Sequence, residues 1–230
     1  MRPTQVLSRV LIAVVLAAMV GPAAAQGFKF SQPDDADRAE TEARQAKIAD
    51  QLSTPCKAAL KDRKIMVLIG QRQSNGFIVA QQQNYGPHFQ AINTRLRALG
   101  LKTYTSEEIR RQIAQAEIDA YFRNDPDAAL NASKKYGASF ILRGLISSQA
   151  SMNPIIPVNQ VVVDMDFTLT GGDGRVISDT HANSGSYAGA DVQRMALTLV
   201  NEQADEVVAK LYSDYCRNAG LAGGNKPQPK

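Results

Sequence analysis

The chain has 230 residues, of which 44% are hydrophobic and 21% are charged, so it is long enough to bury a core within one domain. Its 26 Lys and Arg residues and 22 Asp and Glu residues give a net charge of +4 at pH 7. No basic run of the kind that follows phosphates is present, and this argues against nucleic acid as a partner.

Residues 1–25 have the three parts of a secretory signal peptide. Arg2 and Arg9 give a positive start, residues 10–20 form an apolar core, and residues 23–25 are alanines that suit a cleavage site. The apolar core is too short to anchor the chain across a bilayer, and no cysteine directly follows it to carry a lipid. We therefore predict a cleaved signal peptide, export, and no stable membrane anchor. The alternative is an uncleaved N-terminal anchor.

The two cysteines, Cys56 and Cys216, lie at opposite ends of the foldable part of the chain. In an exported protein, such a pair most simply forms a disulfide. It would close a loop of about 160 residues and stabilise the fold by roughly 4 to 5 kcal/mol or less. The alternative is two separate buried thiols. We predict one domain over 56–216, a mobile leader over 26–55 that can form a partner-binding helix, and a disordered tail over 217–230.

Residues 65–69 are a continuous apolar run, which is typical of a strand buried on both faces in an α/β sheet. A polar, glutamine-rich stretch over 71–84 follows and includes Gln73, Ser74 and Asn75. Open α/β sheets bind ligands at this place, so the stretch is a candidate interaction loop. It lacks the glycine spacing and lysine of a phosphate loop, and the alternative is a solvated connector.

Helices are predicted between this strand and the next one. Apolar residues at steps of three and four over 89–99 predict an amphipathic helix that ends at Gly100. Thr105 and Glu108 form a capping box that opens a helix to about Tyr121. The further elements are a short strand over 101–104, a helix over 126–136 and a strand over 140–146.

The clearest strand signal lies within 160–180. Apolar residues alternate with polar ones over 161–170, which predicts a strand with one buried face. The Gly-Gly-Asp-Gly sequence at 171–174 suits a tight turn, and 175–180 resumes as a second strand. These two strands form an antiparallel hairpin, and a long helix capped by Asp191 follows.

An apolar segment over 147–159 contains Met152, Ile155 and Ile156 among prolines, which are kept out of sheet interiors. If the segment is exposed, it is a candidate interaction loop. If it folds over a sheet edge, it is ordinary cover. Both interpretations remain open at this point.

No catalytic constellation is found in the sequence. His88 and His181 are far apart, and the sequence contains no G-x-S-x-G nucleophile turn. Acyl transfer would require His181 and Asp179 to meet a serine such as Ser178 or Ser184, and spacing alone does not place them together. We predict no catalytic residue, no cofactor and no metal site.

Asp164 and Asp166 lie two positions apart, hence on one face of a strand. Paired carboxylates can serve glycoside hydrolysis or a metal ion. On an exposed strand, such a pair is more typical of a solvated face, and this is the interpretation that we favour.

The predicted order of elements begins with βαβ units and ends with antiparallel strands, so we expect an α/β fold with a mixed sheet flanked by helices. In this order, the segments 135–144 (KYGASFILRG) and 167–177 (FTLTGGDGRVI) resemble a family of bacterial envelope proteins. This family includes the penicillin-binding-protein activator LpoB, the curli secretion component CsgG and the N-terminal domain of TolB.

The resemblance implies a TolB N-terminal-like fold and a periplasmic, non-enzymatic adaptor or assembly domain that binds another cell-envelope protein. The alternative function is a periplasmic module that binds a small ligand or a glycan through the 71–84 loop.

Overall fold

The computed structural model describes residues 35–220, apart from 81, 83–85, 124, 153, 156–157 and 189–190. The predicted signal peptide, Ile156 and residues 221–230 lie outside the described residues. The chain divides into two units, 1–40 and 41–230. Of the first unit, the structure describes the helical residues 35–40, and everything below concerns the second unit.

The elements follow one another in the order that the sequence predicts in outline. They are α1 (Asp35–Ser53), α2 (Lys57–Leu60), β1 (Lys64–Arg72), β2 (Ile78–Val79), α3 (Gly86–Ala98), β3 (Lys102–Thr103), α4 (Ser106–Gln112), α5 (Gln115–Phe122), α6 (Pro126–Tyr136), β4 (Phe140–Met152), β5 (Asn159–Gly171), β6 (Val176–Ala188), α7 (Val192–Tyr215) and the π-helical turn η2 (Cys216–Gly220).

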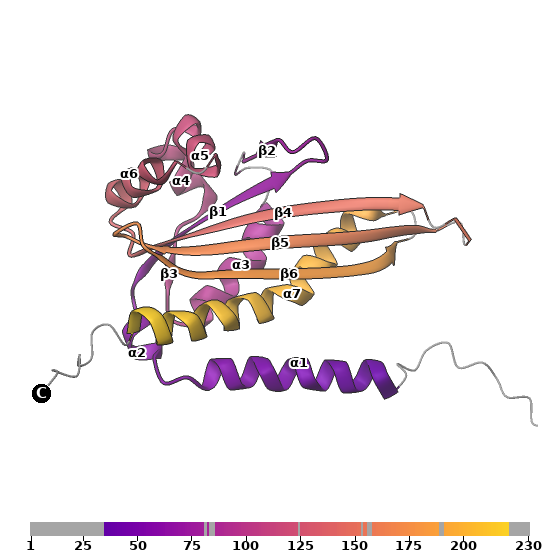
Figure 1. Cartoon of the computed structure of the whole chain (residues 1–230). Coiled ribbons are helices and arrows are strands. Elements are labelled where there is room, and N and C mark those ends of the chain that lie inside the picture. Colours follow the sequence, from indigo (N-terminus) through magenta and orange to yellow (C-terminus); the bar gives the residue numbers. More distant parts are fainter. Residues whose placement is uncertain are drawn as a thin grey trace, which may run out of the picture. The chain divides into compact units, whose positions relative to one another are not determined.

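The strands form one mixed six-stranded sheet in the order β2-β1-β4-β5-β6, with β3 also paired to β1. β1 runs parallel to β3 and β4, whereas β4, β5 and β6 are antiparallel neighbours. A parallel pair needs a long crossover connection, and the helices between β1 and β4 supply it (Figure 1). The predicted α/β fold with a mixed sheet flanked by helices is confirmed.

The centre of the sheet is buried on both faces, as the apolar run at 65–69 predicts. These β1 residues are at most 2% exposed. Helices α3 and α7 pack on one face of the sheet, and α4, α5 and α6 lie over the other face, beside β1 and the first half of β4 (Figure 1). On this second face, a Cβ built on Gly70 would lie 2.7 Å from Phe122 Cε1, so the α5 side chain requires glycine there.

The predicted hairpin of β5 and β6 is present, and its turn contains Gly174 at a φ of +83°. The inward-facing side chains of β5 are buried against α7. They are Val161, Val163, Met165, Phe167 and Leu169.

Two strands are longer than the sequence predicts. β4 was expected to end near 146 but continues to Met152, and β6 was expected to end near 180 but continues to Ala188. The prediction that residues 147–152 form a loop is therefore wrong. These residues are polar or exposed on both sides of β4, so they show no hydrophobic period, and their strand form comes from the backbone ladder with β5.

The single helix predicted over 105–121 is also wrong, because it divides into α4 and α5 at Ile113. In one continuous helix, Ile118 would point about 180° away from Ile109. The extended backbone at Ile113 lets all three side chains enter the core. The Ala114 N–H donates to Glu117 Oε2 at 3.2 Å and begins the second helix.

The capping box at the start of α4 is confirmed. Thr105 Oγ1 accepts from the Glu108 N–H at 3.2 Å, and the Thr105 N–H donates to Glu108 Oε2 at 2.7 Å. The N–H and hydroxyl of Thr105 hold the pKa of the Glu108 carboxyl below its usual value.

Two parts of the second unit that are distant in sequence are joined covalently. Cys56 and Cys216 form a disulfide with their Cα atoms 5.7 Å apart. Beside it, the Tyr212 hydroxyl donates to Thr54 O and accepts from the Cys56 N–H at 3.2 Å. η2 continues the chain beyond Cys216, within the stretch expected to be a disordered tail.

Candidate functional site

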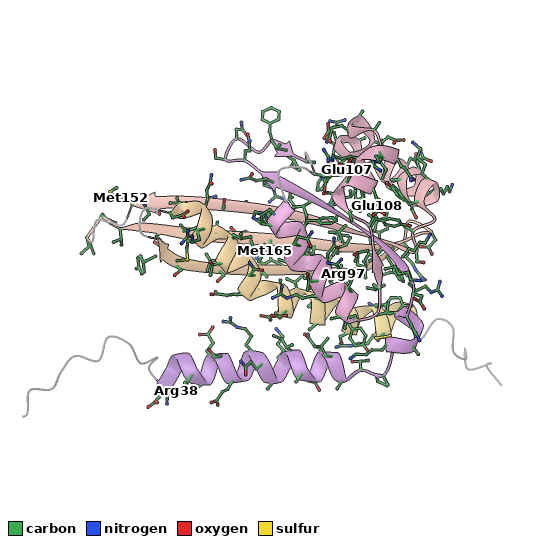
Figure 2. The ribbon with its side chains drawn as sticks, turned by 180° about the vertical axis from the view of Figure 1, so that it is seen from behind. Arg38, Arg97, Glu107, Glu108, Met152 and Met165 are labelled. Carbon is green, nitrogen blue, oxygen red and sulfur yellow. A yellow bond between two sulfur atoms is a disulfide. The ribbon has the colours of Figure 1, made fainter. Side chains whose placement is uncertain are left out.

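The helices cover the two ends of the sheet unequally. We call the distal sheet the part formed by residues 147–152 of β4, 159–166 of β5 and 181–188 of β6, which pair with one another. Helices α4 to α6 lie over the other end, so one face of the distal sheet is open (Figure 1). Figure 2 shows Met152 at the far end of the sheet from Glu107 and Glu108 of α4.

The open face is polar because the even-numbered side chains of β5 point to it, while the odd-numbered ones enter the core. The ladder places Asp164 beside Asn183, and Asp166 beside His181. A groove of about 700 Å³ lies on this face. It is lined by Gln71, Arg72, Gln73, Ser74, Gly76, Ser147, Ser148, Gln149, Asp164, Asp166 and His181.

The charged groups of the groove pair loosely with one another. His181 Nδ1 lies 2.9 Å from Asp166 Oδ1, and Arg72 Nη2 lies 3.8 Å from Asp166 Oδ2. Asn183 donates its side-chain amide to Asp164. About half of each charged side chain is exposed, so each pair contributes only about 0 to 1 kcal/mol. These groups are therefore free to exchange their partners for a bound molecule.

The structure does not assemble the serine hydrolase considered from the sequence. Ser178 and Ser184 alternate with His181 along β6, so their side chains leave the opposite face of the sheet. Ser178 instead donates to Asp214 Oδ2 at 2.6 Å. His88 lies on α3, on the other side of the sheet. Within the described part of the chain, no three His, Cys, Asp or Glu side chains converge as metal ligands.

Two of the predicted loop residues line the groove. Gln73 and Ser74 lie at its border, where β1 ends. Asn75 instead shapes the turn, because its Oδ1 accepts from the Phe77 N–H at 3.1 Å. The stretch over 71–84 thus combines a groove border with a turn, and Phe77 is 72% exposed beside it.

The same stretch contains a buried residue that the sequence does not reveal. Gln82 is 1% exposed, accepts from the Ile69 N–H at 2.9 Å and donates to Ile69 O at 2.8 Å. It also donates to Ala80 O at 2.6 Å. Gln82 thereby completes the hydrogen bonds of β1 like a strand residue. Nothing in the glutamine-rich sequence around it marks it as a buried residue.

A second groove, of about 760 Å³, lies between the starts of α3 and α7. His88, Val192 and Arg194 are among the residues that line it, and Gln73 borders both grooves. Burial lowers the pKa of His88 below its ordinary value, so its imidazole is neutral at neutral pH.

The segment between β4 and β5 is exposed where the structure describes it. Met152 is 69% exposed and Ile155 is 88% exposed. The interpretation of these two residues as cover over a sheet edge is therefore wrong. Their role as interaction residues stays a prediction.

No family model matches the sequence, and no curated protein matches it. Solved structures are similar in fold. Lipoprotein GNA1162 from Neisseria meningitidis has a TM-score of 0.45 and 12% identity over 63% of this chain and 97% of that chain. A minor lipoprotein from Acinetobacter baumannii has a TM-score of 0.39 and 9% identity over 66% and 94%.

The LpoB C-terminal domain from Salmonella enterica has a TM-score of 0.38 and 14% identity, over 61% of this chain and 94% of that chain. Within the described residues, no helix has the length and apolar character needed to cross a membrane.

Proposed function

We propose that this protein is an exported, non-enzymatic adaptor or assembly domain of the periplasm that binds another cell-envelope protein. One observation carries the proposal: the distal sheet projects past helices α4 to α6 and leaves a polar face open (Figure 1). A strand ladder holds its backbone in place, while its exposed side chains are loosely paired. Such a surface is ordered before binding and needs little rearrangement to recognise a partner.

The chemistry of the open face supports recognition rather than catalysis. Asp164 and Asp166 each have a neighbour on β6 and remain partly exposed. The apolar side chains of Met152 and Ile155 extend the surface beyond the polar groove.

In-cell crosslinking tests the proposal directly. A photoreactive amino acid is placed at Gln149 on the distal sheet or at Met152 at its end, and a control is placed at Arg111 on α4, which is also exposed. We expect the two distal positions to capture the same envelope protein and the control position to capture it weakly. Equal capture from all positions, or no capture from any, would contradict an adaptor that uses the distal sheet.

Export can be tested independently by the mass of the chain and by the oxidation state of its cysteines. Mass analysis of the periplasmic fraction should show a chain shortened near residue 25. Alkylation should find no free thiol before reduction and two after it, from Cys56 and Cys216. A full-length chain in the membrane fraction would contradict the cleaved signal peptide.

The groove of about 700 Å³ favours a second candidate, a module that binds a small ligand or a glycan, because Gln73 and Ser74 border it. Thermal-shift screening with cell-wall fragments separates the two functions, since a ligand of the native state raises the melting temperature. A rise that is lost in Asp166→Asn would support this second candidate, and no rise with any fragment would exclude the fragments tested.

A further inference from the structure

Strand β6 forms an unusually long free edge. It pairs with β5 at one side, whereas the opposite edge of the sheet consists of β2 and β3, each two residues long. Near the start of β6 the edge is occupied, because the Asn218 side-chain amide donates to Ile177 O at 3.1 Å. Over 179–187, no hydrogen bond from other described residues reaches the outer side of the strand.

The hairpin turn determines which backbone groups face outward. The Gly171 N–H donates across the hairpin to Arg175 O at 2.9 Å, whereas the Gly172 N–H points to the β4 side. Successive residues of a strand direct their N–H groups to opposite sides. The odd-numbered residues of β5 therefore bond to even-numbered residues of β6. It follows that odd-numbered residues within 179–187 direct their N–H and C=O groups to the free edge.

This edge lacks the usual protection against strand pairing. Exposed edges commonly carry lysine, proline or a bulge, yet residues 176–188 contain no Lys, Arg or Pro. The register shift of the β5–β6 pair lies at the other end, between Leu169 and Thr170. An unprotected edge with regular, outward-facing backbone groups is the feature that β-strand addition requires.

The side chains beside the edge define the strand that would fit. On the open face they are acidic or polar except at Gly185 and the exposed Tyr187, and on the α7 face they are small. The open-face residues are Asp164, Asp166, Asp179, His181, Asn183, Gly185 and Tyr187, and the α7-face residues are Thr180, Ala182, Ser184 and Ser186. A second copy of this chain would bring its own acidic side chains to the edge, and the like charges would repel each other. A strand with lysine or arginine at alternate positions instead meets carboxylates of opposite charge.

We propose that β6 accepts an extended segment of a partner protein as an added strand, with basic side chains on the open face and small apolar ones toward α7. This inference rests on the proposed adaptor function and names the chemistry of its partner. Backbone hydrogen bonds along 179–187 supply affinity, and the alternating side chains supply specificity.

The test compares Asn183→Pro with Asn183→Ala in the purified protein. Both variants lose the amide that bonds to Asp164, but only proline removes the outward N–H, which no β5 residue uses. The probe is a labelled peptide of alternating lysine and valine, and a glutamate and valine peptide is the control. By fluorescence anisotropy, we expect the proline variant to bind the lysine peptide about tenfold more weakly than the alanine variant, through the lost bond and the ring's bulk.

Equal affinity of the two variants, or equal binding of the two peptides, overturns the proposal. Gly185→Pro with Gly185→Ala repeats the comparison if the first proline variant unfolds at a lower temperature. A Cβ at Gly185 would lie 3.5 Å from Val161 O, an ordinary contact, so the alanine control fits. Concentration-dependent dimers of the wild type that disappear in the proline variants assign the edge to a second copy and also overturn it.

In-cell crosslinking separates this inference from the proposed function. If the wild type captures an envelope protein and both Asn183→Pro and Asn183→Ala capture it equally well, strand addition at β6 is overturned, whereas the adaptor function stands. If the wild type captures no protein while the lysine peptide still binds Asn183→Pro more weakly than Asn183→Ala, the adaptor function fails and strand addition at β6 stands.

Discussion

The two ends of the sheet differ in what covers them. At the base, β1 and the first half of β4 lie between helices on both faces, and their side chains interlock closely. A Cβ on Gly144 would lie 2.5 Å from Phe167 Cε1, which shows how little space remains. In the distal sheet, β4 continues beside β5 and β6 with one face open. Stability is therefore expected to reside in the base, and recognition in the distal sheet.

Neighbouring residues of β5 give the largest contrast. Phe167→Ala should reduce the free energy of unfolding by about 3 to 5 kcal/mol, because the buried ring leaves a cavity. Asp166→Ala, one residue away on the open face, removes two exposed ion pairs and should change it by about 1 kcal/mol or less. Urea unfolding measures both. Similar losses in the two variants would remove the distinction between the faces.

The disulfide should contribute next. Replacing both Cys56 and Cys216 with alanine should cost about 2 to 4 kcal/mol, since the bond joins residues 160 apart and limits the unfolded chain. Hydrogen exchange should rise in α1 and the end of α7 while staying slow in β1. If hydrogen exchange rises equally in the distal sheet, the disulfide stabilises the distal sheet as well as the base.

Gln82 provides a test within the polar stretch. Gln82→Leu should reduce the free energy of unfolding by about 2 to 3 kcal/mol, because the N–H and C=O of Ile69 would stay buried and lose their hydrogen-bond partner. The matched change Gln73→Leu, at an exposed position, should stay within about 0.5 kcal/mol. Thermal and urea unfolding compare the pair, and an equal cost would show that Gln82 does not complete β1.

His88 should produce the smallest effect. Its pKa is lowered by burial, so the unfolded chain binds a proton more readily than the folded one. Stability should be complete above the ordinary histidine pKa of about 6.5, and should fall as the pH decreases from there toward the folded value. His88→Gln should flatten this slope in urea unfolding at several pH values. If the slope of stability against pH is unchanged in His88→Gln, another titrating group causes the pH dependence.

Local patterns predicted the elements whose signals are contained in a few neighbouring residues. The apolar run at 65–69, the alternation along β5 and the capping box at Thr105 each appear where expected. In each case, burial or hydrogen bonding repeats with the period of the element itself. The break at Ile113 escaped prediction because it depends on where the core lies, rather than on local propensity.

The candidate site could be predicted only in fragments. Gln73 and Ser74 were singled out by their position after the central strand, and Asp164 and Asp166 by their shared face. Arg72, Ser147 and His181 join them in one groove through the pairing of four strands. No spacing in the sequence reports which strands become neighbours, because pairing is decided by long-range contacts.

The amino-acid sequence by itself determined the fold class, the hairpin at 171–174 and the buried faces of its main strands, because these follow from periodicity and turn chemistry. Tertiary structure alone decided how far β4 and β6 extend, which face stays open and that the long β6 strand forms an edge. A polar strand segment has no hydrophobic signature of its own, so its form depends on the backbone partner that it meets.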